Sequence, residues 1–210
     1  MSGSSIKNPY IRIALRRAQA GTGSSVVSLD RRTAVQQLPD LNHILGEIPW
    51  ALVGAMALRA YAPARTTRDV DIIIHADDEH AARAALIRAG YRIGETLMIG
   101  DFAAHPDAQD GYSIDVLVSH EGWLEQALLQ PSRDPAGFPT LPRRYLILMK
   151  LKAGRAQDIA DITRLLRGTT EAERAAIRAT IVQYAAELLE DYTALVSLTD
   201  LEFGPPPPEP

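Results

Sequence analysis

The sequence contains no cysteine. Disulfide bonds, thiolate metal sites and a cysteine nucleophile are therefore excluded. No uncharged apolar run approaches the length that a membrane-spanning helix needs, and the N-terminus lacks the continuous apolar core of a signal peptide. We therefore expect a cytoplasmic protein with no membrane association.

The chain also has no excess of positive charge. The 210 residues carry a formal net charge of −4, which does not suggest a chain that coats nucleic acid but leaves room for a local basic groove. Apolar residues make up 46% and charged residues 23% of the chain, a balance that is ordinary for a soluble globular protein with a sizeable core. We expect one domain, or one domain with a helical extension.

Both ends of the chain look like appendages. Residues 1–35 are basic and are interrupted by glycine and serine around Gly21 and Gly23, which predicts a flexible N-terminal arm. An alternative is that this arm contacts a polyanion. The last ten residues, 201–210, are rich in proline and predict an extended tail.

Between these ends the predicted secondary structure changes from alternating strands and helices to helices alone. Residues 36–140 alternate short apolar strands, such as 50–54, 70–74 and 113–119, with helical segments, which predicts a mixed sheet with helices packed on it. Residues 141–200 read as helices throughout, including one long helix from Glu171 to Leu195. The predicted fold class is therefore α+β: a mixed β-sheet flanked by helices, with a C-terminal helical part.

Acidic side chains interrupt two of the predicted strands. Asp69 and Asp71 are two residues apart, so on a strand both carboxylates lie on the same face. Two anions held this close repel each other unless a cation lies between them, and Mg²⁺ prefers carboxylate oxygens together with substrate phosphates. Asp115 is a third acid in an apolar strand, and Gly54 opens a helix whose backbone N–H groups attract anions. Together they predict a metal and phosphate site.

Simpler interpretations stay open for these residues. The acids can pair with Arg65 or Arg68, or cap a turn. The five histidines are scattered without zinc spacing and are best explained as structural, and no Ser-His-acid motif has a recognisable nucleophile elbow. Trp50 and Trp123 lie in apolar surroundings and are expected in the core.

Taken together, the segments 53–58 (VGAMAL), 65–74 (RTTRDVDIII) and 113–119 (SIDVLVS) resemble the nucleotidyltransferase superfamily that includes DNA polymerase β. Its signature is an apolar residue, a glycine, a glycine or serine, a gap and an Asp-x-Asp, with a third acid on a later strand. Residues 141–166 are similar to the minimal bacterial nucleotidyltransferases and the abortive-infection, type IV toxin branch. The residues that match there are Lys150, Arg155, Asp158 and Asp161.

The resemblance implies roles for individual residues. Asp69, Asp71 and Asp115 would bind Mg²⁺ or Mn²⁺, and Asp115 would also help to deprotonate the acceptor hydroxyl. Gly54 would let the backbone meet the nucleotide phosphates, and Lys150 would neutralise the triphosphate. The implied reaction moves a nucleoside monophosphate from a nucleoside triphosphate to an acceptor and releases pyrophosphate.

One position departs from this signature. Ala55 stands where many members have serine, so it can offer a phosphate only its backbone N–H. Arg65 and Arg68 are further candidates for nucleotide binding. The alternatives are an active transferase whose acceptor is tRNA, a small molecule or a protein, a toxin with an antitoxin partner, or a weak or inactive member that binds a nucleotide or a partner protein.

Overall fold

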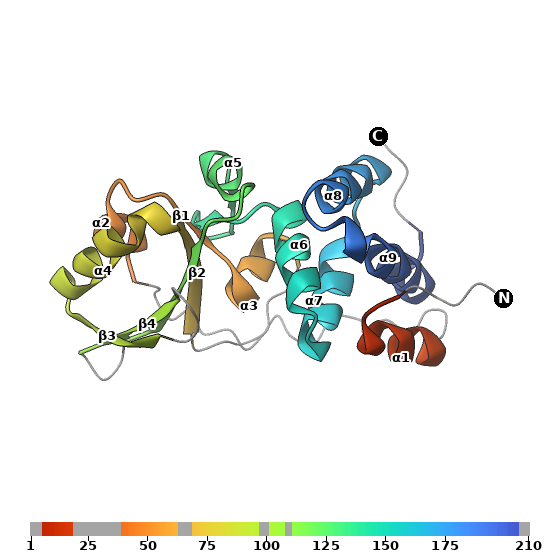
Figure 1. Cartoon of the computed structure of the whole chain (residues 1–210), viewed down its shortest axis with the longest axis horizontal. Coiled ribbons are helices and arrows are strands. Elements are labelled where there is room, and N and C mark those ends of the chain that lie inside the picture. The colour runs from red at the N-terminus through yellow and green to blue at the C-terminus, as the bar shows by residue number, and fades with distance from the viewer. Residues whose placement is uncertain (1–5, 19–38, 63–68, 97–100, 108–110, 206–210) are drawn as a thin grey trace. The chain divides into compact units, whose positions relative to one another are not determined.

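The computed structural model describes residues 6–18, 39–62, 69–96, 101–107 and 111–205 (Figure 1). The chain divides into two compact units. One, which we call the sheet unit, is Val27–Pro142. The other, the helical unit, combines Met1–Val26 with Arg143–Pro210. The sequence-based boundary at residue 140 lies close to the boundary between the units.

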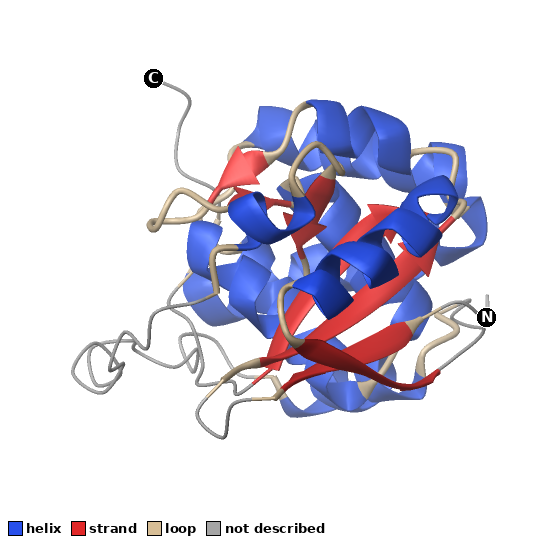
Figure 2. Cartoon of the chain, turned by 90° about the vertical axis from the view of Figure 1, so that its left-hand side faces the viewer, coloured by secondary structure: helices blue, strands red, loops and turns tan. Residues whose placement is uncertain are grey.

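The sheet unit is built on a mixed sheet with the strand order β3-β4-β5-β2-β1-β7-β6. Its strands β2 and β5 are parallel, as are β1 and β7, and the other neighbours are antiparallel. This confirms the predicted mixed sheet (Figure 2). The strands are β1 (Trp50–Leu52), β2 (Asp69–His75), β3 (Tyr91–Thr96), β4 (Phe102–Pro106), β5 (Ser113–Ser119), β6 (Ser132–Arg133) and β7 (Pro139–Thr140).

The central strand β2 explains why an apolar run begins with acids. Val70, Ile72 and Ile74 are fully buried on one face, and Ile73 is buried on the other. Both ends of the strand are more open to solvent: Asp69 is exposed, and Asp71 and His75 are half-buried. The apolar part of β2 therefore anchors the strand in the core and presents its acidic end at the surface.

Short helices connect these strands. Asp40 caps α2 by accepting a hydrogen bond from the backbone N–H of His43, as the sequence predicts. The longest helix of this unit, α4, buries Ala82, Ala85 and Leu86. The helices of the sheet unit are α2 (Leu41–Leu45), α3 (Gly54–Ala57), η2 (Leu58–Ala60), η3 (Ala76–Asp78), α4 (Glu79–Arg88) and α5 (Leu124–Leu129). Trp50 and Trp123 are buried, which confirms their assignment to the core.

The helical unit confirms the predicted C-terminal helical part. It contains α1 (Pro9–Arg17), α6 (Arg143–Ala153), α7 (Ala156–Leu166), α8 (Glu171–Tyr184), η4 (Ala186–Leu188) and α9 (Leu189–Phe203). The prediction of one continuous helix from Glu171 to Leu195 is wrong, because the backbone leaves helical geometry at Ala185 (φ −162°, ψ 54°). The break turns the chain so that Ile181 and Leu195, on successive helices, are both buried.

Part of the predicted flexible arm is an ordered helix. Asn8 caps α1 by accepting a hydrogen bond from the backbone N–H of Tyr10, and its side-chain amide donates to the carbonyl of Gly154 at 2.9 Å. The buried carboxylate of Asp191 accepts the backbone N–H of Lys7 at 2.8 Å. These contacts join α1 to the helical unit, which differs from the flexible arm expected for residues 1–35. The remaining parts of that arm, 1–5 and 19–35, lie outside the described residues.

The predicted proline-rich tail begins later than expected, since α9 continues to Phe203. Residues 206–210 of that tail lie outside the described residues. None of the helices in the described part of the chain is long and apolar enough to cross a membrane.

Candidate active site

The three predicted carboxylates lie on one face of the sheet. Asp71 on β2 and Asp115 on β5 are direct partners in the parallel pairing, so their side chains project from the same face. Asp69 is two residues before Asp71 and shares that face, opposite Ser113. Two adjacent strands thus bring together acids that are more than 40 residues apart, as the sequence predicts.

Gly54 is fitted against this acidic face. Its φ is +59°, a conformation that is unfavourable for residues with a side chain. A Cβ atom at this position would collide with the carboxylate of Asp71. The neighbouring residue, Val53, donates its backbone N–H to the carbonyl of Asp71 at 2.9 Å. The glycine therefore serves two purposes: it allows the turn into α3 and leaves space for the Asp71 side chain.

The electrostatics of the site favour a cation. Burial raises the pKa of Asp115, and the negative charge of Asp69 raises it further, whereas the charge of His105 lowers it. Keeping Asp115 ionised beside Asp69 is therefore unfavourable unless a positive charge balances the pair. Carboxylate oxygens are the ligands that Mg²⁺ prefers, so the chemical nature of the donors fits this ion.

The spatial grouping of these carboxylates is a separate matter from their suitability as ligands. Within the described ranges, no three His, Cys, Asp or Glu side chains are grouped so that they could hold a metal ion as they stand. Asp69 is exposed at the beginning of β2, whereas Asp71 and Asp115 are half-buried. The residues present therefore fit a divalent ion by type and by the face that they share.

A histidine and a serine extend this face, and sequence reasoning missed them. His105 on β4 lies opposite Ser113 on β5, and its Nδ1 atom is 3.0 Å from the Ser113 hydroxyl oxygen. Ser113 is in turn the partner of Asp69 on β2. The sequence assigned all five histidines to structural roles, and the contact with Ser113 is what singles out His105. His105 contacts Ser113 because β4 and β5 are paired, and the spacing of residues along the sequence does not reveal this pairing.

Lys150 lies in the helical unit and has buried partners of its own. Its Nζ atom donates to Asp161 at 2.8 Å and to Asp158 at 3.2 Å, between helices α6 and α7. Burial raises the pKa of Asp158, but the Arg155 hydrogen bond and the Lys150 charge together bring it below its usual value. The polar network expected for Arg155, Asp158 and Asp161 is thus present, and Lys150 is its central member.

The other predicted nucleotide-binding residues are Ala55, Arg65 and Arg68. Ala55 is buried, with 4% of its surface exposed, so its methyl group belongs to the core. Arg65 and Arg68 lie outside the described residues.

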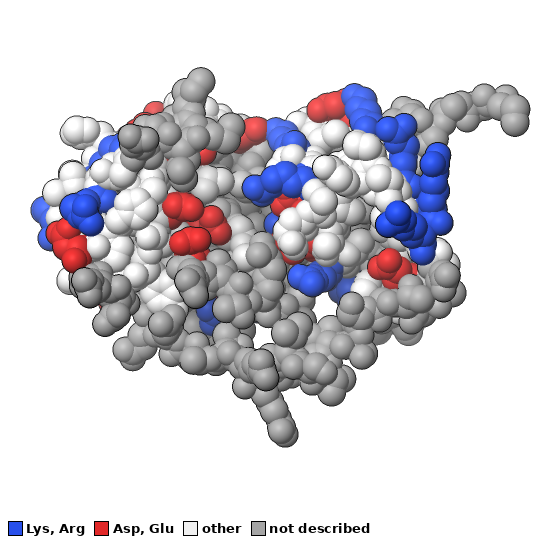
Figure 3. Space-filling model, turned by 90° about the horizontal axis from the view of Figure 1, so that it is seen from below, with Lys and Arg blue, Asp and Glu red and all other residues white. Residues whose placement is uncertain are grey.

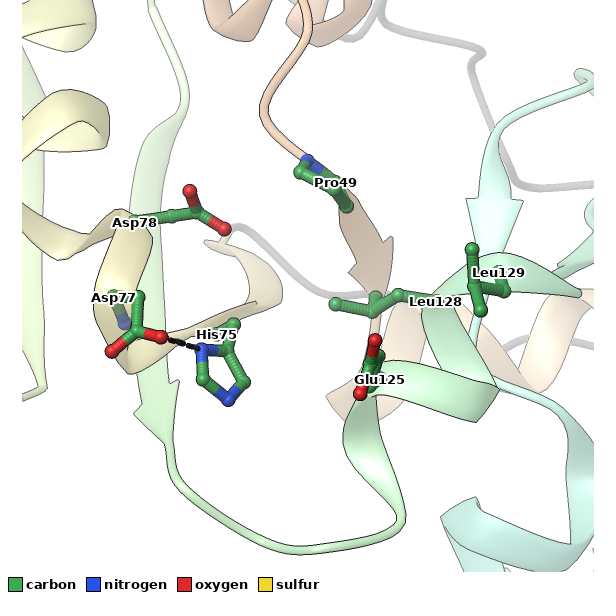
Figure 4. Close-up of a pocket in the computed structure, with 7 residues that line it drawn as sticks. All are labelled: Pro49, His75, Asp77, Asp78, Glu125, Leu128 and Leu129. Carbon is green, nitrogen blue, oxygen red and sulfur yellow. Dashed lines mark hydrogen bonds and ion pairs between the residues drawn. The ribbon is translucent and has the colours of Figure 1, made fainter.

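A pocket of about 610 Å³ lies at the opposite end of β2 (Figure 4). It is lined by Pro49, His75, Asp77, Asp78, Glu125, Leu128 and Leu129. His75 is six residues after Asp69, about 20 Å further along the strand. None of the predicted site residues lines this pocket, so we place the candidate site on the open acidic face of the sheet. Viewed from below, the sheet unit shows a group of exposed acidic side chains (Figure 3).

No family model and no curated protein matches the chain. Several solved structures are similar to it. The antibiotic-resistance factor ANT(2'')-Ia in solution is 14% identical and has a TM-score of 0.48, covering 73% of this chain and 95% of that chain. A crystal structure of ANT(2'')-Ia with adenylyl-2''-tobramycin is 16% identical and has a TM-score of 0.43, covering 75% and 95%.

The third similar structure is an antigenic nucleotidyltransferase-like protein from Paracoccidioides brasiliensis. It is 15% identical and has a TM-score of 0.40, covering 74% of this chain and 86% of that chain.

Proposed function

We propose that the chain is a Mg²⁺-dependent nucleotidyltransferase. The observation that carries the proposal is the acidic face of the sheet unit, where Asp71 and Asp115 are paired on parallel strands and Asp69 lies beside them. Carboxylates that share one sheet face favour the binding of a cation, and a divalent ion bound to a nucleoside triphosphate would be such a cation.

Each residue of this face has a defined task. Asp69, Asp71 and Asp115 would hold Mg²⁺ or Mn²⁺, and the ion would supply positive charge to the triphosphate and to the pyrophosphate leaving group. Gly54, having no Cβ, keeps the Asp71 carboxylate in place and lets the backbone before α3 approach a phosphate. The acceptor oxygen attacks the α-phosphorus, the bond to the β-phosphate oxygen breaks, and Asp115 helps to take the acceptor proton.

Of the cationic residues predicted for the triphosphate, Lys150 has buried acidic partners. Lys150 is already held by two carboxylates, which favours a structural task over phosphate binding. Arg65 and Arg68 lie four residues and one residue before Asp69 in the chain and are our candidates for binding the triphosphate.

The acceptor is a separate question. A tRNA acceptor, and with it a toxin role with an antitoxin partner, is favoured by the basic residues of the helical unit, among them Arg16 and Arg17 on α1. A small-molecule or protein hydroxyl fits the acidic net charge better. The alternative function is a weak or inactive nucleotide-binding protein. Ala55 favours it, because it lacks the hydroxyl that would hold a phosphate.

A labelling experiment tests the proposal. The chain is incubated with Mg²⁺ and each α-labelled nucleoside triphosphate, together with RNA, protein or small-molecule fractions of the cell. We expect one combination to give a labelled product, and Asp69→Asn to reduce the rate at least about 100-fold, because a metal ligand is lost. Absence of any labelled product, under conditions in which nucleotide still binds, would favour the inactive alternative.

A further inference from the structure

A serine and a histidine stand beside the acidic face. Ser113 precedes Asp115 by two residues on β5, so both side chains lie on the same face of the sheet. Across the parallel pairing Ser113 faces Asp69, and across the antiparallel pairing it faces His105. The hydroxyl of Ser113 is therefore placed between the carboxylates on one side and an imidazole on the other.

The contact between Ser113 and His105 has the geometry of an activated nucleophile. The distance of 3.0 Å between the Ser113 Oγ and the His105 Nδ1 is a hydrogen bond. When the hydroxyl donates to Nδ1, the imidazole can accept its proton as the oxygen attacks. A serine with a base at this distance is the usual arrangement in nucleophilic catalysis.

The neighbouring strand makes room for the ring. Gly94 on β3 lies against the His105 imidazole, and a Cβ at this position would be 2.9 Å from its Nε2 atom. Without that Cβ, the ring can lie over β3 while its Nδ1 atom points to β5. Gly94 thus contributes to the position of His105.

Among the residues that the structure describes, charged groups lie on two sides of His105. Asp69 and Asp115 lie towards the acidic side, and the charge of His105 acts on Asp115. On the other side Arg92 is the strand partner of His105, and its guanidinium is held by Asp107 at 2.9 Å.

We propose that Ser113 is an internal acceptor hydroxyl, so that the chain transfers a nucleoside monophosphate to itself at this residue. This inference rests on the proposed function, because it uses the same acidic face. The Ser113 Oγ attacks the α-phosphorus of a nucleoside triphosphate, and an Oγ–phosphorus bond forms. The bond from that phosphorus to the bridging oxygen breaks, and pyrophosphate leaves with the electron pair. The hydroxyl proton passes to His105 Nδ1 and then to solvent.

The mass of the intact full-length chain tests this proposal. The chain is incubated with Mg²⁺ and each of the common ribonucleoside triphosphates in turn. We expect the mass to increase by one nucleoside monophosphate residue with at least one of them, and peptide mapping to locate the addition at Ser113. Mapping on the unaltered chain identifies the site without depending on a variant that must fold.

Matched variants separate chemistry from structure. Ser113→Ala should remain unlabelled, whereas Ser119→Ala, on the same face and strand, should be labelled like the unaltered chain. His105→Gln should be labelled about 100-fold more slowly, in line with the loss of a general base. His80→Gln, which alters an exposed histidine on α4, should have no effect.

The outcomes are distinguishable. If an external acceptor is labelled but the chain itself is not, or if the label maps to another residue, the proposal for Ser113 is wrong and nucleotidyl transfer stands. If neither the chain nor any external acceptor is labelled, the proposed function fails and the self-transfer fails with it.

Discussion

Gly54 is the residue at which backbone geometry and site chemistry meet. Gly54→Ala should lower the free energy of unfolding by about 1–3 kcal/mol, because the new methyl group meets the Asp71 carboxylate and strains a backbone at φ +59°. It should also weaken the binding of Mg²⁺ and nucleotide, because the carboxylate must move. Urea denaturation and nucleotide titration measure the two effects.

Gly46 supplies the control for this substitution. Its φ is +61°, but a Cβ there would meet no atom within 4 Å. Gly46→Ala should therefore show the backbone strain alone and leave nucleotide binding unchanged. Equal effects of the two substitutions on binding would mean that the Asp71 contact has no part in the site.

Asp115 illustrates how the site opposes folding stability. Its pKa is raised, first by burial and then by Asp69, so the folded chain binds this proton more tightly than the unfolded chain. The free energy of unfolding therefore decreases as pH rises through the raised pKa, and the loss remains at neutral pH. A bound divalent ion would offset the cost of keeping Asp115 ionised at neutral pH. The raised pKa of Asp115 is therefore consistent with a role as a metal ligand.

Among the elements, helices α6 and α7 are joined by the buried ammonium of Lys150. Lys150→Met should lower the free energy of unfolding by about 3 kcal/mol, because Asp158 and Asp161 lose their buried partner. The exposed Lys152 on the same helix is the control, and Lys152→Met should change stability by less than about 0.5 kcal/mol. A loss of nucleotide affinity at unchanged stability would restore the phosphate-binding role predicted from the sequence.

The same network should make stability depend on pH. The pKa of Asp158 is lowered in the folded chain, so its stabilising effect is present above its ordinary pKa and is lost as pH falls through the lowered value. In Lys150→Met this loss on acidification should be smaller, because one of the two cations responsible for the lowered pKa is absent.

Local patterns predicted the elements whose sequences are periodic or clearly capped. The apolar run of β2 and the Asp40 cap of α2 are examples. The two-residue strands β6 and β7 are too short to produce a period, and the break at Ala185 contains neither glycine nor proline. The order of α1 depends on Asp191, a partner 183 residues from Asn8, which no local pattern can reveal.

The residues of the candidate site likewise include some that local sequence predicts and some that it does not. Asp69 and Asp71 were predictable because their spacing on one strand fixes a common face. His105 was not, because its contact with Ser113 depends on the register of two strands. Likewise, the partners of Lys150 depend on how two helices pack. Sequence spacing thus identifies residues that share an element, and the structure identifies those that share a site.

At the scale of the whole molecule, the sheet unit contains the acidic face, Gly54 and the Ser113–His105 pair, whereas Lys150 is a member of the helical unit. The central claim is that the acidic face binds a nucleoside triphosphate together with a divalent ion. Thermal unfolding of the full-length chain with Mg²⁺ and each triphosphate tests this claim most directly.

At a ligand concentration 100 times the dissociation constant, binding should stabilise the folded chain by about 2.7 kcal/mol. For a protein of this size the Tm should rise by about 5–10 °C. The rise should require Mg²⁺ and disappear in Asp71→Asn, whereas Asp77→Asn, at the far end of the sheet, should retain it. No rise with any triphosphate, or an undiminished rise in Asp71→Asn, would contradict the claim.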